Sequence, residues 1–237
     1  MTGTTPDRSA YARLVLETMP QESRIGLTLG FVRTFGVPEI AEVLHATGRM
    51  TTEPWDRAKA TGTAMFALIE HGPGSPEGRR IVDELRRVHD RPGITPELMH
   101  YVLACFTVCP LRFLADYAGR PATGAELAAA RTFHHDLAAA LTLPEPPAAE
   151  LAGLAGWMSA FEDRRFAPSP AGRALWEATS GLLATRLPTP LAPLGPAVAA
   201  ALLDQPLRTA LGIRRPPAPI RALVSRALRA RARQAAG

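Results

Sequence analysis

Apolar residues in this 237-residue chain recur at intervals of three and four over long segments. Few stretches alternate β-branched or aromatic residues with polar ones, as the strands of a sheet do. Most prolines stand at the junctions between the apolar segments. With 46% hydrophobic residues, the chain is long enough to bury one sizeable core. We therefore predict an all-α fold that forms a single multi-helix domain.

The best-bounded predicted helix covers residues 75–90, which read SPEGRRIVDELRRVHD. Ser75 can accept hydrogen bonds from free backbone amides, Pro76 suits the first helical position and Glu77 suits the positive helix end. Arginines and acids occupy one face of this helix. We expect His89, at the end of the other face, to point into the protein interior. The residues on that face are Ile81, Val82, Leu85, Val88 and His89.

A histidine in this position has two interpretations. The imidazole can be a buried structural group that a backbone carbonyl satisfies, which is the more common case. It can instead present a nitrogen lone pair to a haem iron in a dry pocket. The spacing of residues within this helix does not decide between the two.

Two further predicted helices carry candidate polar groups. Glu42 and His45 lie within one turn of each other on the helix expected at 38–47, where they are weak candidates for a general acid and base pair. Arg57 and Thr61 share a face of the helix expected at 53–70, above an apolar stripe. They are either an ordinary surface arginine and a threonine bonded to its own helix, or a cation and a donor that overlook a pocket.

The most apolar stretch, residues 96–119, is expected to form the central helix of the core. Pro110 should kink or break that helix. Arg112 places a charge among apolar neighbours and therefore needs a partner, which we expect to be Asp116 or an acid group of a cofactor. Cys105 and Cys109 are four residues apart, as expected of reduced thiols packed in a core.

The pI of about 10.0 comes from the C-terminal part of the chain. From Ile213 onward there are seven arginines and no acid, and the rest of the chain has 20 of the 27 basic residues against 22 acids. We expect no nucleic-acid partner. The predicted C-terminal helix is basic and amphipathic, so it either docks on the body or makes peripheral contact with an anionic membrane.

No signal-like apolar segment opens the sequence and no apolar run approaches about 18 residues, so we predict a cytoplasmic protein that can associate with membranes.

Several segments, taken together in their order and spacing, resemble the MpaB-like oxygenase family. The catalytic domain of that family is shared with the rubber oxygenases, or latex clearing proteins. The resemblance covers nearly the whole chain. The matching segments are FGVPEIAEVLHATG, the pair Arg57 and Thr61, EHGPGSPEGRR, LRRVH ending at His89, MHYVLACFTVCPLRF, FEDRRFAPSPAGR and PLRTALGIRRPP.

The resemblance implies an all-α domain with a globin-like core that binds haem b. It implies that His89 is the proximal iron ligand and that Arg112 belongs to the haem environment. It also implies that Arg57 and Thr61 lie close to the haem, as catalytic residues that orient or polarise bound dioxygen. Rubber oxygenases carry a lysine directly before the threonine, whereas this chain has Ala60 there and Lys59 about 100° away around the helix. The expected organisation is a polar leader at 1–20, a catalytic domain at 21–212 and a basic helix at 213–237.

The function predicted from this resemblance is a haem b-dependent oxygenase. It would act with dioxygen on a small hydrophobic substrate, of isoprenoid or lipid-like character, with Glu42 as the base if an allylic proton is removed. Two alternatives stay open: a non-catalytic haem-binding or redox-sensing helical protein, and a haem-free helical binding protein with a basic tail.

Overall fold

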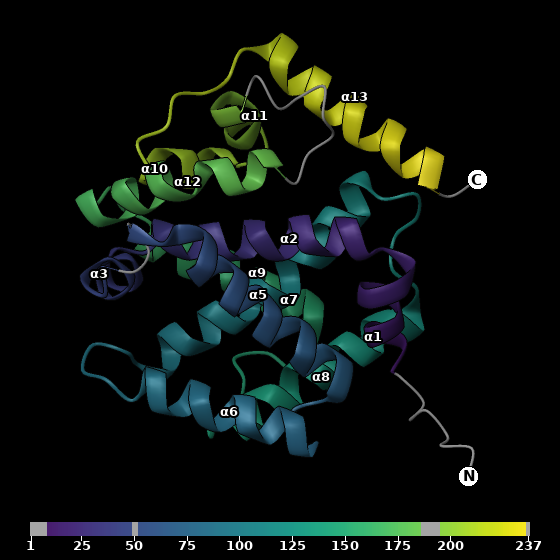
Figure 1. The fold of residues 1–237 in the computed structure, drawn as a ribbon, viewed down its shortest axis with the longest axis vertical. Coiled ribbons are helices and arrows are strands. Elements are labelled where there is room, and N and C mark those ends of the chain that lie inside the picture. Colours follow the sequence, from purple (N-terminus) through teal and green to yellow (C-terminus); the bar gives the residue numbers. More distant parts are fainter. Residues whose placement is uncertain (1–8, 49–51, 186–194, 236–237) are drawn as a thin grey trace.

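The computed structural model describes residues 9–48, 52–185 and 195–235 (Figure 1). These residues form helices and turns without a strand, which confirms the predicted all-α single domain. Two short elements are a π-helical turn, η1 (Leu14–Thr18), and a 3₁₀ turn, η2 (Thr34–Gly36). The α-helices are α1 (Ala10–Arg13), α2 (Pro20–Arg33), α3 (Pro38–Ala46), α5 (Pro54–His71), α6 (Pro76–His89), α7 (Pro96–Tyr117), α8 (Gly124–Ala140), α9 (Leu151–Arg165), α10 (Pro170–Thr185), α11 (Gly195–Ala201), α12 (Gln205–Ala210) and α13 (Ala218–Ala235).

Helices α2 and α7 make the most extensive contact in the fold, because two glycines let their backbones approach closely. A Cβ atom on Gly26 would lie 2.4 Å from the Cα atom of Pro110, and one on Gly30 would lie 2.5 Å from the carbonyl oxygen of Cys105. Of the two predicted effects of Pro110, a kink or a break, the break does not occur, since α7 continues to Tyr117. The kink stays a prediction. Close packing against α2 supports the proline-containing segment from one side.

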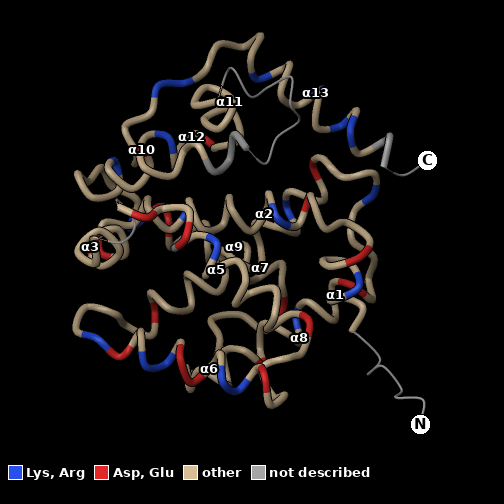
Figure 2. Tube along the Cα trace, viewed as in Figure 1, with Lys and Arg blue, Asp and Glu red and all other residues tan. Residues whose placement is uncertain are grey.

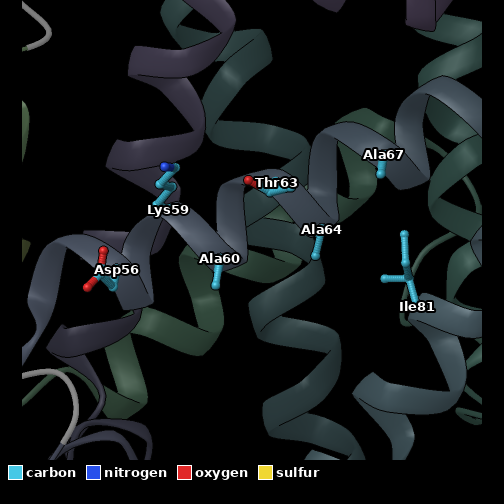
Figure 3. Close-up of a pocket in the computed structure, with 7 residues that line it drawn as sticks. All are labelled: Asp56, Lys59, Ala60, Thr63, Ala64, Ala67 and Ile81. Carbon is cyan, nitrogen blue, oxygen red and sulfur yellow. The ribbon is translucent and has the colours of Figure 1, made fainter.

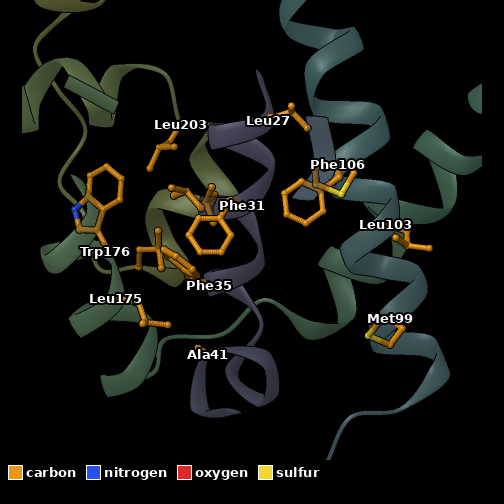
Figure 4. Close-up of a cluster of buried hydrophobic side chains, with 14 of the residues drawn as sticks. Leu27, Phe31, Phe35, Ala41, Met99, Leu103, Phe106, Leu175, Trp176 and Leu203 are labelled. Atoms are coloured by element: carbon orange, nitrogen blue, oxygen red, sulfur yellow. The ribbon is translucent and has the colours of Figure 1, made fainter. Parts of the chain in front are cut away.

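The largest group of buried apolar side chains fills the space between α2, α7 and α10 (Figure 4). Phe31 of α2 and Phe35 of η2 pack edge to face, with ring centroids 5.1 Å apart. Burial of such large side chains removes apolar surface from water and is the main term that stabilises the fold. The labelled side chains in Figure 4 are Leu27, Phe31, Phe35, Ala41, Met99, Leu103, Phe106, Leu175, Trp176 and Leu203.

Part of the range predicted as a polar leader contributes to the core. Tyr11, Leu14 and Val15 of α1 and η1 are buried and belong to an apolar cluster with Leu114 of α7 and Ala130 of α8. The prediction of a polar leader overlooked the apolar residues between Ala10 and Met19, which pack against α7 and α8.

Helices α5 and α6 form a hairpin whose turn depends on two glycines. Gly72 ends α5 with a φ of 78°, a conformation that favours glycine. A Cβ on Gly78 would lie 2.0 Å from the carbonyl oxygen of Gly72, so the start of α6 can approach the turn only because this residue is glycine. In Figure 1, α6 and α13 lie at opposite ends of the molecule.

Candidate functional site

An open groove of about 470 Å³ runs along α5 where it faces α6 (Figure 3). This volume lies within the range of roughly 300–1000 Å³ that is typical of small-molecule and cofactor sites. Ala60, Ala64 and Ala67 recur at helical spacing, and their small side chains leave room beside α5. The residues that line the groove are Asp56, Lys59, Ala60, Thr63, Ala64 and Ala67 of α5 and Ile81 of α6.

The apolar face of α6 is only partly covered by the rest of the protein. Of the five residues predicted to face inward, Val82 is buried and the other four, His89 among them, are half-buried. The predicted burial of His89 is therefore only partly correct. The physical reason is that α6 has its most extensive contact with one helix, α5.

The ring of His89 has a defined orientation. Its Nδ1 atom lies 2.7 Å from the carbonyl oxygen of Leu85, and because a carbonyl only accepts, Nδ1 carries the hydrogen. A neutral ring in this tautomer has its lone pair on Nε2. Leu85 and His89 follow Ile81 at four-residue spacing and therefore lie on the same face of α6. Ile81 itself lines the groove. A backbone carbonyl that fixes one nitrogen is also the usual arrangement of a metal-ligating histidine.

Thr61 lies on a different side of α5 from the groove. It lines a smaller cavity of about 40 Å³ between α2, α5 and α7, together with apolar side chains such as Phe31, Met65 and Phe106. Ala60, one residue earlier, lines the groove instead, because neighbouring residues on a helix diverge by about 100°. The side chain of Arg57 lies outside the described residues. The structure therefore does not bring Thr61 and His89 to one cavity.

Glu42 and Arg112 line neither of these cavities. Glu42 is exposed on α3. Arg112 is exposed on α7, and its Nη2 atom lies 3.3 Å from the carbonyl oxygen of Ala155 and 3.4 Å from Oγ of Ser159, both on α9. The expected partner Asp116 is not the one observed, because the turn of α7 beyond Pro110 faces α9.

A buried polar cluster between α7 and α8 is absent from the sequence prediction. His134 and His100 are 2% and 5% exposed, and Nδ1 of His134 lies 3.0 Å from Oγ1 of Thr107. Burial lowers the pKa of both rings, and His100 and His135 lower that of His134 further, to about 4. The sequence signal was the polar residue His100 in an apolar helix, which the pattern did not distinguish from its neighbours.

A buried ion pair joins α2 to α9. Nη2 of Arg33 lies 2.6 Å from Oε2 of Glu162, and the hydroxyl of Tyr101 donates to Oε1 of the same carboxylate at 3.0 Å. Burial is the largest single influence on Arg33 and opposes its charge, but the hydrogen bond to Glu162 and the negative charges of Glu162 and Asp204 together outweigh burial and raise the pKa of the guanidinium. This arrangement is fully paired, so it holds the fold together and offers no open position to a ligand.

The geometry defines an all-α protein with an open groove, flanked by a helix that ends in a histidine oriented as metal ligands are. The chain belongs to the family described as ER-bound oxygenase mpaB/B'/Rubber oxygenase, catalytic domain, which matches residues 21–234. This match confirms the resemblance to the MpaB-like family.

Curated fungal relatives agree with the family. The chain is 26% identical over 196 residues to the ER-bound oxygenase mpaB' of Penicillium brevicompactum. The aligned region covers 76% of this chain and 46% of that protein. It is 25% identical over 196 residues to the ER-bound oxygenase mpaB of Penicillium roqueforti (strain FM164). This second alignment covers 76% of this chain and 66% of that protein. The chain thus spans about half to two thirds of the length of these relatives. The family and both relatives are described as oxygenases.

One described helix, α7, is long and apolar enough to cross a membrane by length and composition alone, with a mean hydropathy of 1.6 over its best window. We did not expect such a segment, because His100, Thr107 and Arg112 interrupt its apolar run. Since 72% of that window is buried inside the fold, the same composition is explained by a core helix.

Proposed function

We propose that this protein is a haem b-dependent oxygenase that acts with dioxygen on a small hydrophobic substrate. The observation that carries the proposal is the position of His89, on the α6 face that borders the groove, with its Nδ1 held by the Leu85 carbonyl. Membership of an oxygenase family supports the same conclusion.

The groove residues fit a flat, largely apolar group that carries carboxylates. Ala60, Ala64 and Ala67 let such a group lie against α5, and Ile81 gives it an apolar contact from α6. Lys59 and Asp56 also line the groove, and of these two charged residues Lys59 is the cation suited to a propionate. When bound, haem supplies the redox chemistry that dioxygen requires.

The chain's own residues would perform three tasks in this reaction. The Leu85 carbonyl keeps Nδ1 of His89 protonated, so Nε2 is the nitrogen that can donate to iron. The alanine-lined side of α5 would cover one side of the cofactor. The open side of the groove would admit a lipid-like substrate, because the cavity of about 40 Å³ beside Thr61 is too small for one and lies on another side of α5.

A haem-binding protein without turnover is the second candidate, and a specific observation favours it. Thr61 lines the α2 side of α5, and Glu42 is exposed on α3, so two of the three predicted catalytic groups do not face the groove, and the side chain of the third, Arg57, lies outside the described residues. A purified protein that binds haem but consumes no dioxygen with any hydrophobic substrate would support this second function over the first.

The test is the visible absorption spectrum of the purified full chain, with haem supplied during expression and quantified after extraction. We expect a Soret band with close to stoichiometric haem, and its loss in His89→Ala. His71→Ala is the matched control, because His71 is exposed at the other end of the same hairpin and should leave the spectrum unchanged. Ala64→Phe should reduce haem content by filling the groove while His89 stays in place.

The proposal fails if the folded wild-type protein remains colourless after haem has been supplied. It also fails if His89→Ala and His71→Ala retain haem equally. Circular dichroism of each variant separates loss of haem from loss of the helical fold.

A further inference from the structure

The last helix, α13, is docked on the body by its apolar side. Val224 and Leu228 are buried against Ile25 of α2, Phe113 of α7 and Val198 of α11. The helix therefore does not need a further apolar partner to be stable. The opposite side of α13 faces the solvent.

That outer side is basic and carries one large apolar residue. Arg226 and Arg229 are exposed on it, and Leu223 beside them is 48% exposed. Arg214 and Arg215, in the segment that leads into α13, are exposed as well. We call these five residues the arginine face.

The arginine face lacks the carboxylates that accompany arginines elsewhere in the protein. Arg120, Arg165 and Arg173 form ion pairs with Glu126, Glu39 and Glu177. No Asp or Glu follows Asp204 in the sequence, and among the described residues no carboxylate pairs with a member of the arginine face. Figure 2 shows basic residues without acidic ones along α13, whereas α6 carries both signs.

The arginines beneath this face add to the same positive field. Arg208 is buried, and its pKa is lowered by burial and by the charges of Arg215 and Arg221. The Nε atom of Arg221 is buried without a hydrogen-bond partner. Like charges that gather in this way repel each other, and a bound anion relieves the repulsion.

We propose that the arginine face docks the protein on a membrane surface that contains anionic phospholipids. Arginines pair with lipid phosphates through two parallel hydrogen bonds, and a basic helix side is attracted by the negative potential of such a surface. Leu223, in the middle of the face, can enter the boundary between headgroups and acyl chains. An exposed leucine adds nothing to phosphate binding on a nucleic acid, so it favours the lipid surface.

Docking through α13 leaves the groove accessible. Because α6 and α13 lie at opposite ends of the molecule, a protein attached through the arginine face holds the groove away from the membrane (Figure 1). Attachment and haem binding are then independent, and each can be tested without the other.

The experiment is co-sedimentation of the full chain with phosphatidylcholine vesicles that contain or lack phosphatidylserine. We expect binding only when phosphatidylserine is present, and its loss between about 0.1 M and about 1 M salt, where the Debye length falls from about 10 Å to about 3 Å. Arg226→Glu/Arg229→Glu should weaken binding by at least roughly 25-fold, since each arginine near such a surface contributes about 1 kcal/mol, a factor of about 5. Leu223→Ser should weaken it less.

Arg80→Glu/Arg86→Glu is the matched control, because it changes the net charge equally at exposed positions of α6. We expect this variant and His89→Ala to bind vesicles as the wild type does. Equal loss in both double variants would mean that only net charge matters and would overturn the proposal. Equal binding to uncharged vesicles, or tighter binding to duplex DNA than to anionic vesicles in the same buffer, would also overturn it.

Discussion

His134 should make the stability of this protein sensitive to mild acid. Oγ1 of Thr107 donates to the carbonyl oxygen of Leu103 at 2.9 Å, so the same oxygen must accept from Nδ1 of His134 at 3.0 Å. The neutral ring then carries its lone pair on Nε2, which is buried without a hydrogen-bond partner. A proton added to Nε2 would be a buried charge with no acceptor, which explains the direction of the pKa shift.

The size of the effect follows from the lowered pKa. The pKa of His134 is about 4, because of burial and then the nearby His135 and His100, compared with an ordinary value of about 6.5. An unfolded chain takes up this proton as the pH falls through about 6.5, whereas the folded protein takes it up only near 4. The contribution of His134 to stability is therefore complete above about pH 6.5 and decreases by roughly 3 kcal/mol as the pH falls to about 4.

The assay is urea unfolding, followed by circular dichroism, at several pH values from about 7.5 to 4. His134→Gln keeps an N–H donor for Thr107 and does not titrate in this range, so its stability should fall less with acid than that of the wild type. His45→Gln, at an exposed position of α3, is the control and should follow the wild type. Parallel curves for the wild type and His134→Gln would refute the reasoning, because other titrating groups contribute equally to both.

Two further predictions concern helix packing. Gly26→Ala should lower the unfolding free energy by roughly 1–3 kcal/mol, because the new methyl group would meet the Pro110 backbone at 2.4 Å. Gly156→Ala in α9 meets nothing within 4 Å and should be neutral or slightly stabilising, so equal thermal unfolding temperatures of the two variants would contradict the packing argument. Arg33→Ala should cost roughly 3–5 kcal/mol, since it leaves the buried Glu162 without its cation. An Arg33→Met/Glu162→Met variant should recover part of that loss in the same denaturation assay.

Local signals in the sequence predict the ends and faces of the helices well. Ser75 begins α6 as expected, since its Oγ accepts from the Gly78 amide at 2.9 Å. Thr95 likewise accepts from Leu98 at the start of α7. These signals are local because a cap needs only residues within one turn. The predicted globin-like arrangement of the core stays a prediction.

The depth of a side chain depends on neighbours that the sequence pattern does not identify. His89 lies on the predicted face of α6, but it is half-buried because α5 is the main helix that packs there. Arg112 has apolar neighbours along the chain, yet its turn of α7 is exposed and contacts α9. Burial is set by contacts between distant segments, and a periodic pattern gives only the direction of each side chain.

The position of α5 is what decides between the two proposed functions. This helix separates the groove from the cavity next to Thr61, and the step of about 100° between Ala60 and Thr61 assigns them to different sides. For Thr61 and His89 to act on one bound group, α5 would have to rotate about its axis or the group would have to reach around it. Such a rotation is resisted on the α2 side by the packing of Met65 and Leu68, which are 6% and 0% exposed. With α5 in this orientation, a haem held through His89 would have no contact with Thr61, and this is the observation that favours the second candidate function.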